Sequence, residues 1–173
     1  MSEIWKDIPG YEGRYQASTE GRIRSVDREI KARSRYGNPH SRHYFGRVLR
    51  PGRMPSGHMS VVLGHGQPGS TVHALVMLTF VGPPPEGKEV CHNDGNPANN
   101  RLDNLRYDTR GENIIDDLKR GTRSKAKFRA EDVRRIKRLL VEGKTGAAIA
   151  RQFGVKPRLI SDIKMGRTYA WVK

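Results

Sequence analysis

Residues 89–113 read EVCHNDGNPANNRLDNLRYDTRGEN, with a cysteine, a histidine and several asparagines between two short apolar runs. The runs EVCH and NLRYD have the composition of short strands, and DGNPANNRLD between them is rich in turn residues. Thr109 is a suitable N-cap for a helix over RGENIIDDLKR, which ends at Gly121. The predicted order is strand, loop, strand, helix, with His92 at the end of the first strand and Asn113 on the first helical turn.

Each of these polar residues also has an ordinary structural explanation. A single cysteine in a strand is usually a small buried apolar residue, and asparagine is common in turns for backbone reasons alone. A lone histidine is usually structural as well. The spacing argues for function, because His92 is followed twelve residues later by Asn104 and nine residues after that by Asn113.

Length and composition limit the classes of protein that are possible. The chain has 173 residues, of which 35% are apolar, and this low fraction favours several small units over one large globule. No apolar run approaches the roughly 20 residues of a membrane span, and MSEIWKDIPG lacks the features of a signal peptide, so a cytoplasmic protein is expected. The single cysteine, Cys91, excludes an internal disulfide and the multi-cysteine zinc folds.

The net charge of +15 and the pI near 10.4 indicate a nucleic-acid partner. Residues 20–60 hold ten Lys or Arg against three acidic residues, and residues 119–173 hold seventeen against four. Residues 86–118 reverse the balance, with four against eight. Two basic regions around an acidic centre suit a protein that grips a polyanion and keeps carboxylates, with a cation, in the middle. The alternative is a generally solubilising surface.

The first segment, residues 5–64, predicts a small antiparallel sheet from short β-like runs such as RYQAS and MSVVLG, separated by Gly and Pro. Within it, residues 28–47 have almost no apolar periodicity and are rich in arginine. This part predicts an exposed basic hairpin or loop that contacts phosphates through Arg33 and Arg35. A solvated loop without a partner is the alternative.

Helical patterns dominate the rest of the chain. VHALVMLTF, residues 72–80, places apolar residues near helical spacing and predicts a core helix. After residue 130, VRRIKRLLVEG and TGAAIARQFGVKPRLISDI have helix-turn-helix spacing, with Thr145 as a cap, Gly154 in the turn and Pro157 at the start of the last helix. The polar face of that helix would meet the major groove with Lys156, Arg158, Ser161 and Asp162. A helical bundle for protein contacts is the alternative.

Three stretches of the chain together resemble one family. His92, Asn104 and Asn113, with the surrounding DGN, NN and NLR strings, resemble the HNH nuclease motif in the subgroup whose third position is asparagine. The opening WKDIPGYEGRYQASTEGRIRS resembles the modular motif that precedes the nuclease core in many phage and intron HNH endonucleases, and the C-terminal helices resemble the DNA-binding modules of resolvases and repressors. From end to end, the chain resembles the phage-borne HNH homing endonucleases.

The fold class that follows is α+β, with a small N-terminal antiparallel sheet, a central ββα-metal nuclease core and a C-terminal helix-turn-helix. The expected domain bounds are 1–68 for the basic β module, 69–122 for the nuclease core and 130–173 for the helix-turn-helix module. A basic linker, 123–129, joins the last two.

Hydrolysis of a phosphodiester needs an activated water, a cation to neutralise phosphate charge and a basic surface to hold the strand. Neutral imidazole, with an unperturbed pKa of about 6.5, can take the proton of the water, which makes His92 the expected general base. The resemblance implies that Cys91 and Asn113 ligate one divalent ion. It also implies that Asn104 holds the loop and the histidine in place by backbone hydrogen bonds.

Cys91 departs from the family pattern, which commonly has aspartate at this position. Oxygen ligands suit Mg²⁺ or Mn²⁺, the expected ions, whereas a thiolate suits softer metals such as Zn²⁺. Three alternatives follow: the metal preference is altered, Asp94 contributes a ligand, or the site is impaired.

The expected activity is site-specific nicking of double-stranded DNA by a monomer, which leaves a 5′ phosphate and a 3′ hydroxyl. No membrane and no small-molecule substrate are expected, and a phage-encoded enzyme would act in the cytoplasm of the host cell. The alternative is a non-catalytic, sequence-specific DNA-binding regulator with a decayed nuclease core.

Overall fold

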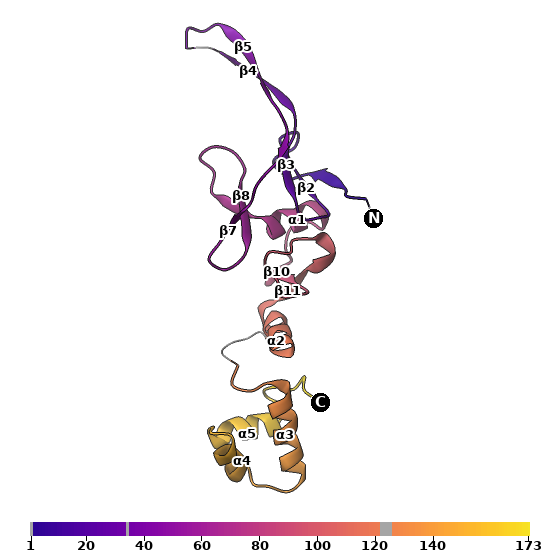
Figure 1. Cartoon of the computed structure of the whole chain (residues 1–173), viewed down its shortest axis with the longest axis vertical. Coiled ribbons are helices and arrows are strands. Elements are labelled where there is room, and N and C mark those ends of the chain that lie inside the picture. The colour runs from indigo at the N-terminus through magenta and orange to yellow at the C-terminus, as the bar shows by residue number, and fades with distance from the viewer. Residues whose placement is uncertain (1, 34, 122–125) are drawn as a thin grey trace. The chain divides into compact units, whose positions relative to one another are not determined.

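The computed structural model describes residues 2–33, 35–121 and 126–173. It divides into two compact units, Met1–Arg110 and Gly111–Lys173. The described residues form small antiparallel sheets and five α-helices, which confirms the predicted α+β class (Figure 1).

Four small sheets, all antiparallel, lie in the described part of the first unit, and two of them have more than two strands. The strands predicted from RYQAS and MSVVLG are confirmed as β2 and β8. The four-stranded sheet has the order β1 (Trp5–Asp7), β2 (Tyr15–Ser18), β3 (Ile23–Ser25), β6 (Arg47–Val48), and the three-stranded sheet has the order β7 (Gly52–Arg53), β8 (Met59–Val62), β9 (Gly69–Thr71).

A long hairpin leaves the first sheet between β3 and β6 and projects away from it (Figure 1). It consists of β4 (Arg28–Arg33) and β5 (Pro39–Tyr44), paired only with each other. Residues 39–43 of β5 are exposed, because polar and charged residues occupy both of its faces. The predicted exposed basic hairpin is therefore confirmed.

The core of the first unit joins the N-terminal segment to the segment that follows it. The predicted helix is confirmed as α1 (Val72–Phe80), whose Val72, Leu75, Val76 and Met77 are buried. These residues pack in one cluster with Leu105, further along the chain, and with residues in or directly after the strands of the sheets, among them Ile8, Ala17, Ile23, Val61 and Leu63.

The motif segment has the predicted order of elements. β10 (Lys88–His92) pairs antiparallel with β11 (Leu105–Thr109), and a 3₁₀ turn, η1 (Leu102–Asn104), ends the loop between them. The predicted helix follows as α2 (Arg110–Arg120), and Gly121 ends it with a φ of +70°, a conformation that glycine adopts without a steric penalty. From Gly111 onward, α2 belongs to the second unit.

The helices after α2 in the second unit are α3 (Ala130–Val141), α4 (Gly146–Gln152) and α5 (Pro157–Lys164). Their core includes Val133, Ile136, Ile149, Ile160 and Ile163. Two local predictions are confirmed, since the Thr145 hydroxyl accepts a hydrogen bond from the Ala148 amide at 3.3 Å and Pro157 opens α5. The helix-turn-helix assignment and the domain bounds stay predictions, and residues 123–125 of the predicted linker lie outside the described residues.

A membrane-spanning helix is not found in the part of the chain that the structure describes, because none of its helices combines the necessary length with apolar character.

Candidate active site

His92 ends strand β10, where it pairs with Leu105, the first residue of β11. Only 7% of its surface is exposed, although histidine is polar, so a hydrogen-bond partner for at least one ring nitrogen is expected. The two strands thus place an imidazole at the mouth of the loop formed by residues 93–104.

The side chains of Asp94 and Asn104 fix the shape of this loop, the active-site loop, by hydrogen bonds. The Asn104 side chain, 9% exposed, accepts from the Asp94 amide at 3.1 Å and donates to the Asn99 carbonyl at 2.9 Å and to Asp94 Oδ1 at 3.0 Å. Asp94 Oδ1 also accepts from the Asn96 amide, and Asp94 Oδ2 accepts from Asn99 Nδ2 at 2.7 Å. Because both its carboxylate oxygens accept hydrogen bonds within the loop, Asp94 serves to shape it.

Asn100 sets the orientation of the His92 ring. Its Nδ2 donates to the Ala98 carbonyl at 3.1 Å, which turns its Oδ1 toward His92 Nε2 at 3.5 Å. An amide oxygen only accepts, so this contact favours the tautomer with the proton on Nε2 and a free lone pair on Nδ1. Among the described residues, His92 Nδ1 has no hydrogen-bond partner. The atom that can accept a proton is therefore the one left available.

Two further histidines surround the His92 ring. His73, near the start of α1, lies 5.2 Å from it between ring centroids, and His58, in the turn before β8, lies 5.7 Å away. His58 and His73 are 4.9 Å apart. The three rings are not a metal site, because within residues 2–33, 35–121 and 126–173 no group of three His, Cys, Asp or Glu side chains could hold an ion.

Burial favours the neutral form of His73 and His92. It lowers the pKa of His73 to about 4, and His92 and His58 add to the effect. Burial likewise lowers the pKa of His92 below its ordinary value, while Asn100 and Asp94 act in the opposite direction and His58 adds to the lowering. A neutral imidazole is the form that a general base needs.

The Asp94 carboxyl responds differently to its surroundings. Burial raises the pKa of Asp94, but hydrogen bonds from Asn99, the Asn96 amide and Asn104 outweigh it and leave that pKa below the ordinary value. The loop is thus held by an ionised carboxylate, whose hydrogen bonds are stronger than those of a neutral acceptor.

Cys91 lies next to His92 in the strand but is only 1% exposed, and its Sγ contacts the carbonyl of Glu89 at 3.7 Å. Buried thiols with apolar neighbours behave as small core side chains. Asn113, the other predicted ligand, is half-buried on α2 in the second unit, so its pairing with Cys91 stays a prediction.

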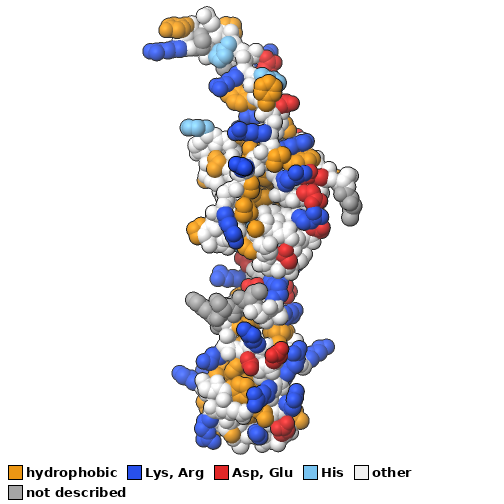
Figure 2. All heavy atoms as spheres, viewed as in Figure 1, with side chains coloured by type: hydrophobic (Ala, Val, Ile, Leu, Met, Phe, Trp, Pro, Cys, Tyr) orange, Lys and Arg blue, Asp and Glu red, His pale blue; other side chains and the backbone are white. Residues whose placement is uncertain are grey.

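The residues predicted to contact DNA are all exposed. Arg33 ends β4 and Arg35 follows at the tip of the hairpin, whereas the other three lie at and after the start of α5: Lys156, Arg158 and Ser161. Figure 2 shows Lys and Arg side chains on the visible face of the hairpin and of the α3–α5 region.

Comparison with known proteins places this geometry in a family. The NUMOD4 motif model matches residues 3–64, and the HNH endonuclease model matches residues 70–114. The DNA endonuclease I-HmuI of Bacillus phage SP01 is 34% identical over 135 residues, which cover 77% of this chain and 67% of that protein. The chain belongs to the HNH homing endonuclease family.

Two more similarities extend this result. An uncharacterised HNH endonuclease of Acanthamoeba polyphaga mimivirus is 33% identical over 118 residues, which cover 65% of this chain and a quarter of that protein (25%). A solved structure, described as DNA binding and cleavage by the HNH homing endonuclease I-HmuI, matches with a TM-score of 0.51 and 25% identity over 92% of this chain and 88% of that one. The chain is thus an HNH endonuclease in fold and in sequence.

HNH nucleases generally use a divalent metal ion, and the predicted ligands of this HNH endonuclease fit such an ion only in part. Asn113 offers an amide oxygen, which Mg²⁺ or Mn²⁺ accepts. Cys91 does not fit, because it offers a buried thiol to an ion that prefers oxygen. Asp94 does not replace it readily, since loop hydrogen bonds already engage both its oxygens.

Sequence reasoning missed two contributors to the site of this HNH endonuclease. Asn100 follows Asn99 in a run of turn residues, which gives it no distinct signal of its own. The NN string that resembles the family motif is the one feature that could have pointed to it. His58 is 34 residues before His92, at a spacing that matches no local pattern, so no sequence signal identified it.

Proposed function

We propose that this endonuclease hydrolyses one strand of double-stranded DNA at a specific site, with His92 as the general base and with a divalent ion as cofactor. The observation that carries the proposal is the state of the His92 ring, which is buried, neutral and turned so that Nδ1 is free. Its family relatives support DNA as the substrate, since I-HmuI is named a DNA endonuclease.

In this mechanism His92 Nδ1 removes the proton of a water molecule as the water attacks phosphorus. The contact of Nε2 with Asn100 steadies the ring while positive charge develops on it. The bond from phosphorus to the 3′ oxygen then breaks and the departing oxygen takes a proton from water, which leaves a 5′ phosphate and a 3′ hydroxyl. A bound divalent ion, held by Asn113, would supply charge neutralisation at the phosphate.

The two basic regions would hold the substrate. Arg33 and Arg35 on the hairpin suit phosphate contacts, because an exposed strand pair can follow a groove. Lys156, Arg158 and Ser161 at the start of α5 suit base contacts if α3–α5 act as a helix-turn-helix. One site per chain predicts a nicking monomer, active in the cytoplasm of its host.

The test is nicking of supercoiled plasmid DNA with Mg²⁺, Mn²⁺ and Zn²⁺ in parallel, by the wild type and by His92→Ala. The variant should lose activity by a factor on the order of 10² to 10⁴ and keep its affinity for DNA, because general-base catalysis contributes about that much. Activity retained in His92→Ala would remove this residue from the mechanism.

A second function is favoured by one observation, the buried thiol at a predicted ligand position. In that case the chain would be a sequence-specific DNA-binding regulator with a decayed nuclease core. Sequence-specific binding without nicking in any of the three metals would support it.

A further inference from the structure

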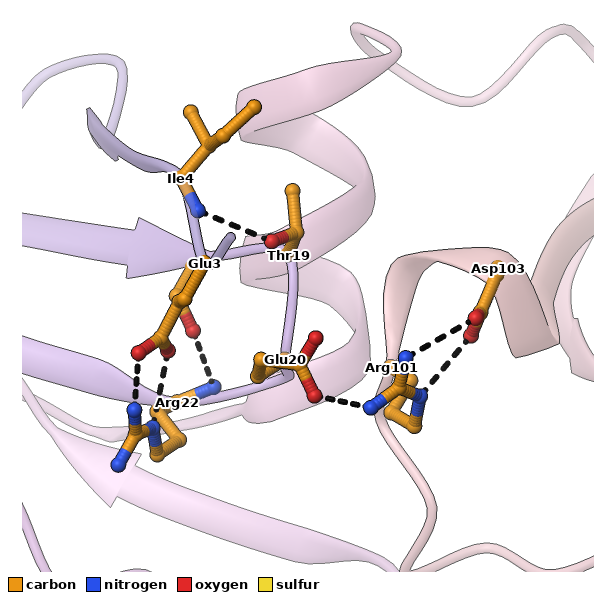
Figure 3. A network of polar contacts seen from close by, with 8 residues as sticks. Glu3, Ile4, Thr19, Glu20, Arg22, Arg101 and Asp103 are labelled. Atoms are coloured by element: carbon orange, nitrogen blue, oxygen red, sulfur yellow. Dashed lines mark hydrogen bonds and ion pairs between the residues drawn. The ribbon is translucent and has the colours of Figure 1, made fainter. Parts of the chain in front are cut away.

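The active-site loop does not stand alone, because the N-terminal motif lies against it. The turn formed by Thr19, Glu20 and Gly21, between β2 and β3, meets residues 100–103 (Figure 3). The Leu102 amide donates to the Thr19 carbonyl at 2.9 Å. Beside it, the Arg101 guanidinium pairs with Glu20 and also with Asp103 at 3.1 Å. A backbone hydrogen bond and an ion pair thus join segments about eighty residues apart in the chain.

Gly21 makes the closest approach. A Cβ added to it would lie 2.5 Å from both the carbonyl carbon and the oxygen of Asn100 and 3.0 Å from the Arg101 amide. Its φ of +77° also lies in the left-handed region. Glycine is needed here for two separate reasons, backbone conformation and direct contact with the peptide between Asn100 and Arg101.

Asn100 is the residue that orients His92. Its backbone rests on Gly21, its Nδ2 bonds to Ala98, and its Oδ1 faces His92 Nε2. A shift of the Asn100 backbone would therefore move the acceptor that selects the ring tautomer. The N-terminal motif stands two contacts away from the proposed base.

We propose that the Thr19–Gly21 turn of the N-terminal motif is a positioning element for the nuclease reaction, which holds Asn100 against His92 through the Gly21 contact and the Arg101–Glu20 ion pair. This inference rests on the proposed role of His92 as the general base. It gives the N-terminal motif a part in the chemical step that is separate from any part in DNA binding.

Figure 3 also shows a matched control within the same network. Glu3 pairs with Arg22, and the Ile4 amide donates to Thr19 Oγ1 at 3.1 Å. The Glu3–Arg22 pair is made within the N-terminal motif and does not reach residues 100–103. Its loss should affect the motif without moving the active-site loop.

The main experiment compares Gly21→Ala with Gly10→Ala in the full chain. Gly10 has a φ of +81°, and an added Cβ there meets nothing within 4 Å, so both variants carry the backbone strain but only Gly21→Ala carries the clash. Single-turnover nicking of a supercoiled plasmid that the wild type cuts should slow on the order of 10²-fold in Gly21→Ala, as a displacement of about 1 Å at a reacting group does. Plasmid affinity should match that of Gly10→Ala, because the contact acts on the chemical step.

If Gly21→Ala does not fold, two less disruptive variants, each changing one ion pair, test the positioning proposal. Glu20→Gln removes the charge that Glu20 brings to its pair with Arg101, leaves the Arg101–Asp103 pair in place, and should slow nicking about two- to fivefold, the range expected for a partly exposed pair. Glu3→Gln should nick at the wild-type rate. Equal rates for Glu20→Gln and Glu3→Gln in that case would overturn the proposal.

His92→Ala, measured beside these variants, distinguishes failure of the general-base proposal from failure of the positioning proposal. If His92→Ala stays active, the general-base proposal fails and the positioning proposal fails with it. If His92→Ala is inactive but Gly21→Ala and Gly10→Ala nick at the same rate, only the positioning proposal fails. Loss of plasmid affinity in Gly21→Ala at an unchanged nicking rate would also overturn it, since the turn would then serve binding.

Discussion

The active-site loop and the β4–β5 hairpin are both polar and rich in turn residues, yet they direct their side chains in opposite ways. In the loop, Asp94 and Asn104 turn inward and bond to the loop itself. In the hairpin, Arg33 and Arg42 are exposed, and Arg42 stacks on Tyr44 together with the half-buried Arg28, at 5.2 and 5.0 Å from the ring centroid. Short amides and carboxylates satisfy nearby backbone groups, whereas long guanidinium side chains keep their charge in water.

The contrast also bears on what each region can do. A loop whose hydrogen bonds are satisfied internally fixes a reacting group within a fraction of an ångström, which catalysis requires. An exposed hairpin with no core of its own can follow a polyanion but cannot fix one atom. The same difference separates the loop from the exposed face of α5.

The largest effect is expected when Asn104, whose side chain holds the active-site loop, is replaced. Asn104→Ala removes the partner of the Asp94 amide and of the Asn99 carbonyl, and should lower the free energy of unfolding by about 1–3 kcal/mol. Nicking should fall on the order of 10²-fold, because the loop carries Asn100. Thermal unfolding and single-turnover nicking measure the two effects.

Ser41→Ala in β5 is the matched control, since Ser41 is exposed and should change stability by no more than about 0.5 kcal/mol. Wild-type stability and nicking in Asn104→Ala would remove the difference drawn between the two regions.

An intermediate effect is expected on α5. Arg158, whose side chain is 91% exposed, should cost about 1–3 kcal/mol on the preferred site when replaced by Ala and much less on random DNA. Affinity for cognate and scrambled duplexes gives the comparison. An equal loss on both duplexes would mean that α5 only grips the backbone, as the hairpin is proposed to do.

The pH dependence of nicking should report on the loop and not on the hairpin. His92 must be neutral to accept a proton, so the rate rises with pH through its pKa and then levels off. Because burial lowers the pKa of His92 from 6.5, the midpoint should lie below pH 6.5. His58→Asn removes a group that lowers the same pKa, and should therefore move the midpoint upward.

His65, which is exposed and lies outside the ring cluster, provides the control: His65→Asn should leave the midpoint in place. A midpoint above pH 6.5 in the wild type would contradict the assignment of the acid limb to His92.

The smallest effect is expected from the hairpin. Arg33→Ala and Arg35→Ala should weaken binding to a similar degree on all sequences, and each should reduce the slope of log affinity against log salt by about one if the charge contacts a phosphate. Binding across a salt series on two unrelated duplexes measures this. A sequence-dependent loss would show that the hairpin reads bases, and would make it resemble α5 in function.

The elements of this fold were predictable where they depend on neighbours in the sequence. Thr145 caps α4 and Gly121 ends α2 because capping involves residues three or four apart. The order of β10, the loop, β11 and α2 followed from composition and turn residues in the same way.

The site was less predictable because its neighbours are distant in sequence. His58 and His73 reach His92 only through the folding of three separate elements. Thr19 meets Leu102 across more than eighty residues. Apolar periodicity shows that a face of α1 is buried, but it does not show which strands cover that face.

The shared core has a consequence for how such proteins can be recombined. Ile8 and Ala17 from the N-terminal motif pack in one cluster with Val76 and Leu105 from the HNH segment. A chimera joined between residues 64 and 70 would build this core from two different proteins, and side chains that did not evolve together would pack poorly. Of the described residues between Tyr107 and Phe128, none belongs to either core, so a crossover there leaves both cores whole. Grafting a new C-terminal helical unit onto this nuclease should therefore succeed where exchanging its N-terminal motif fails.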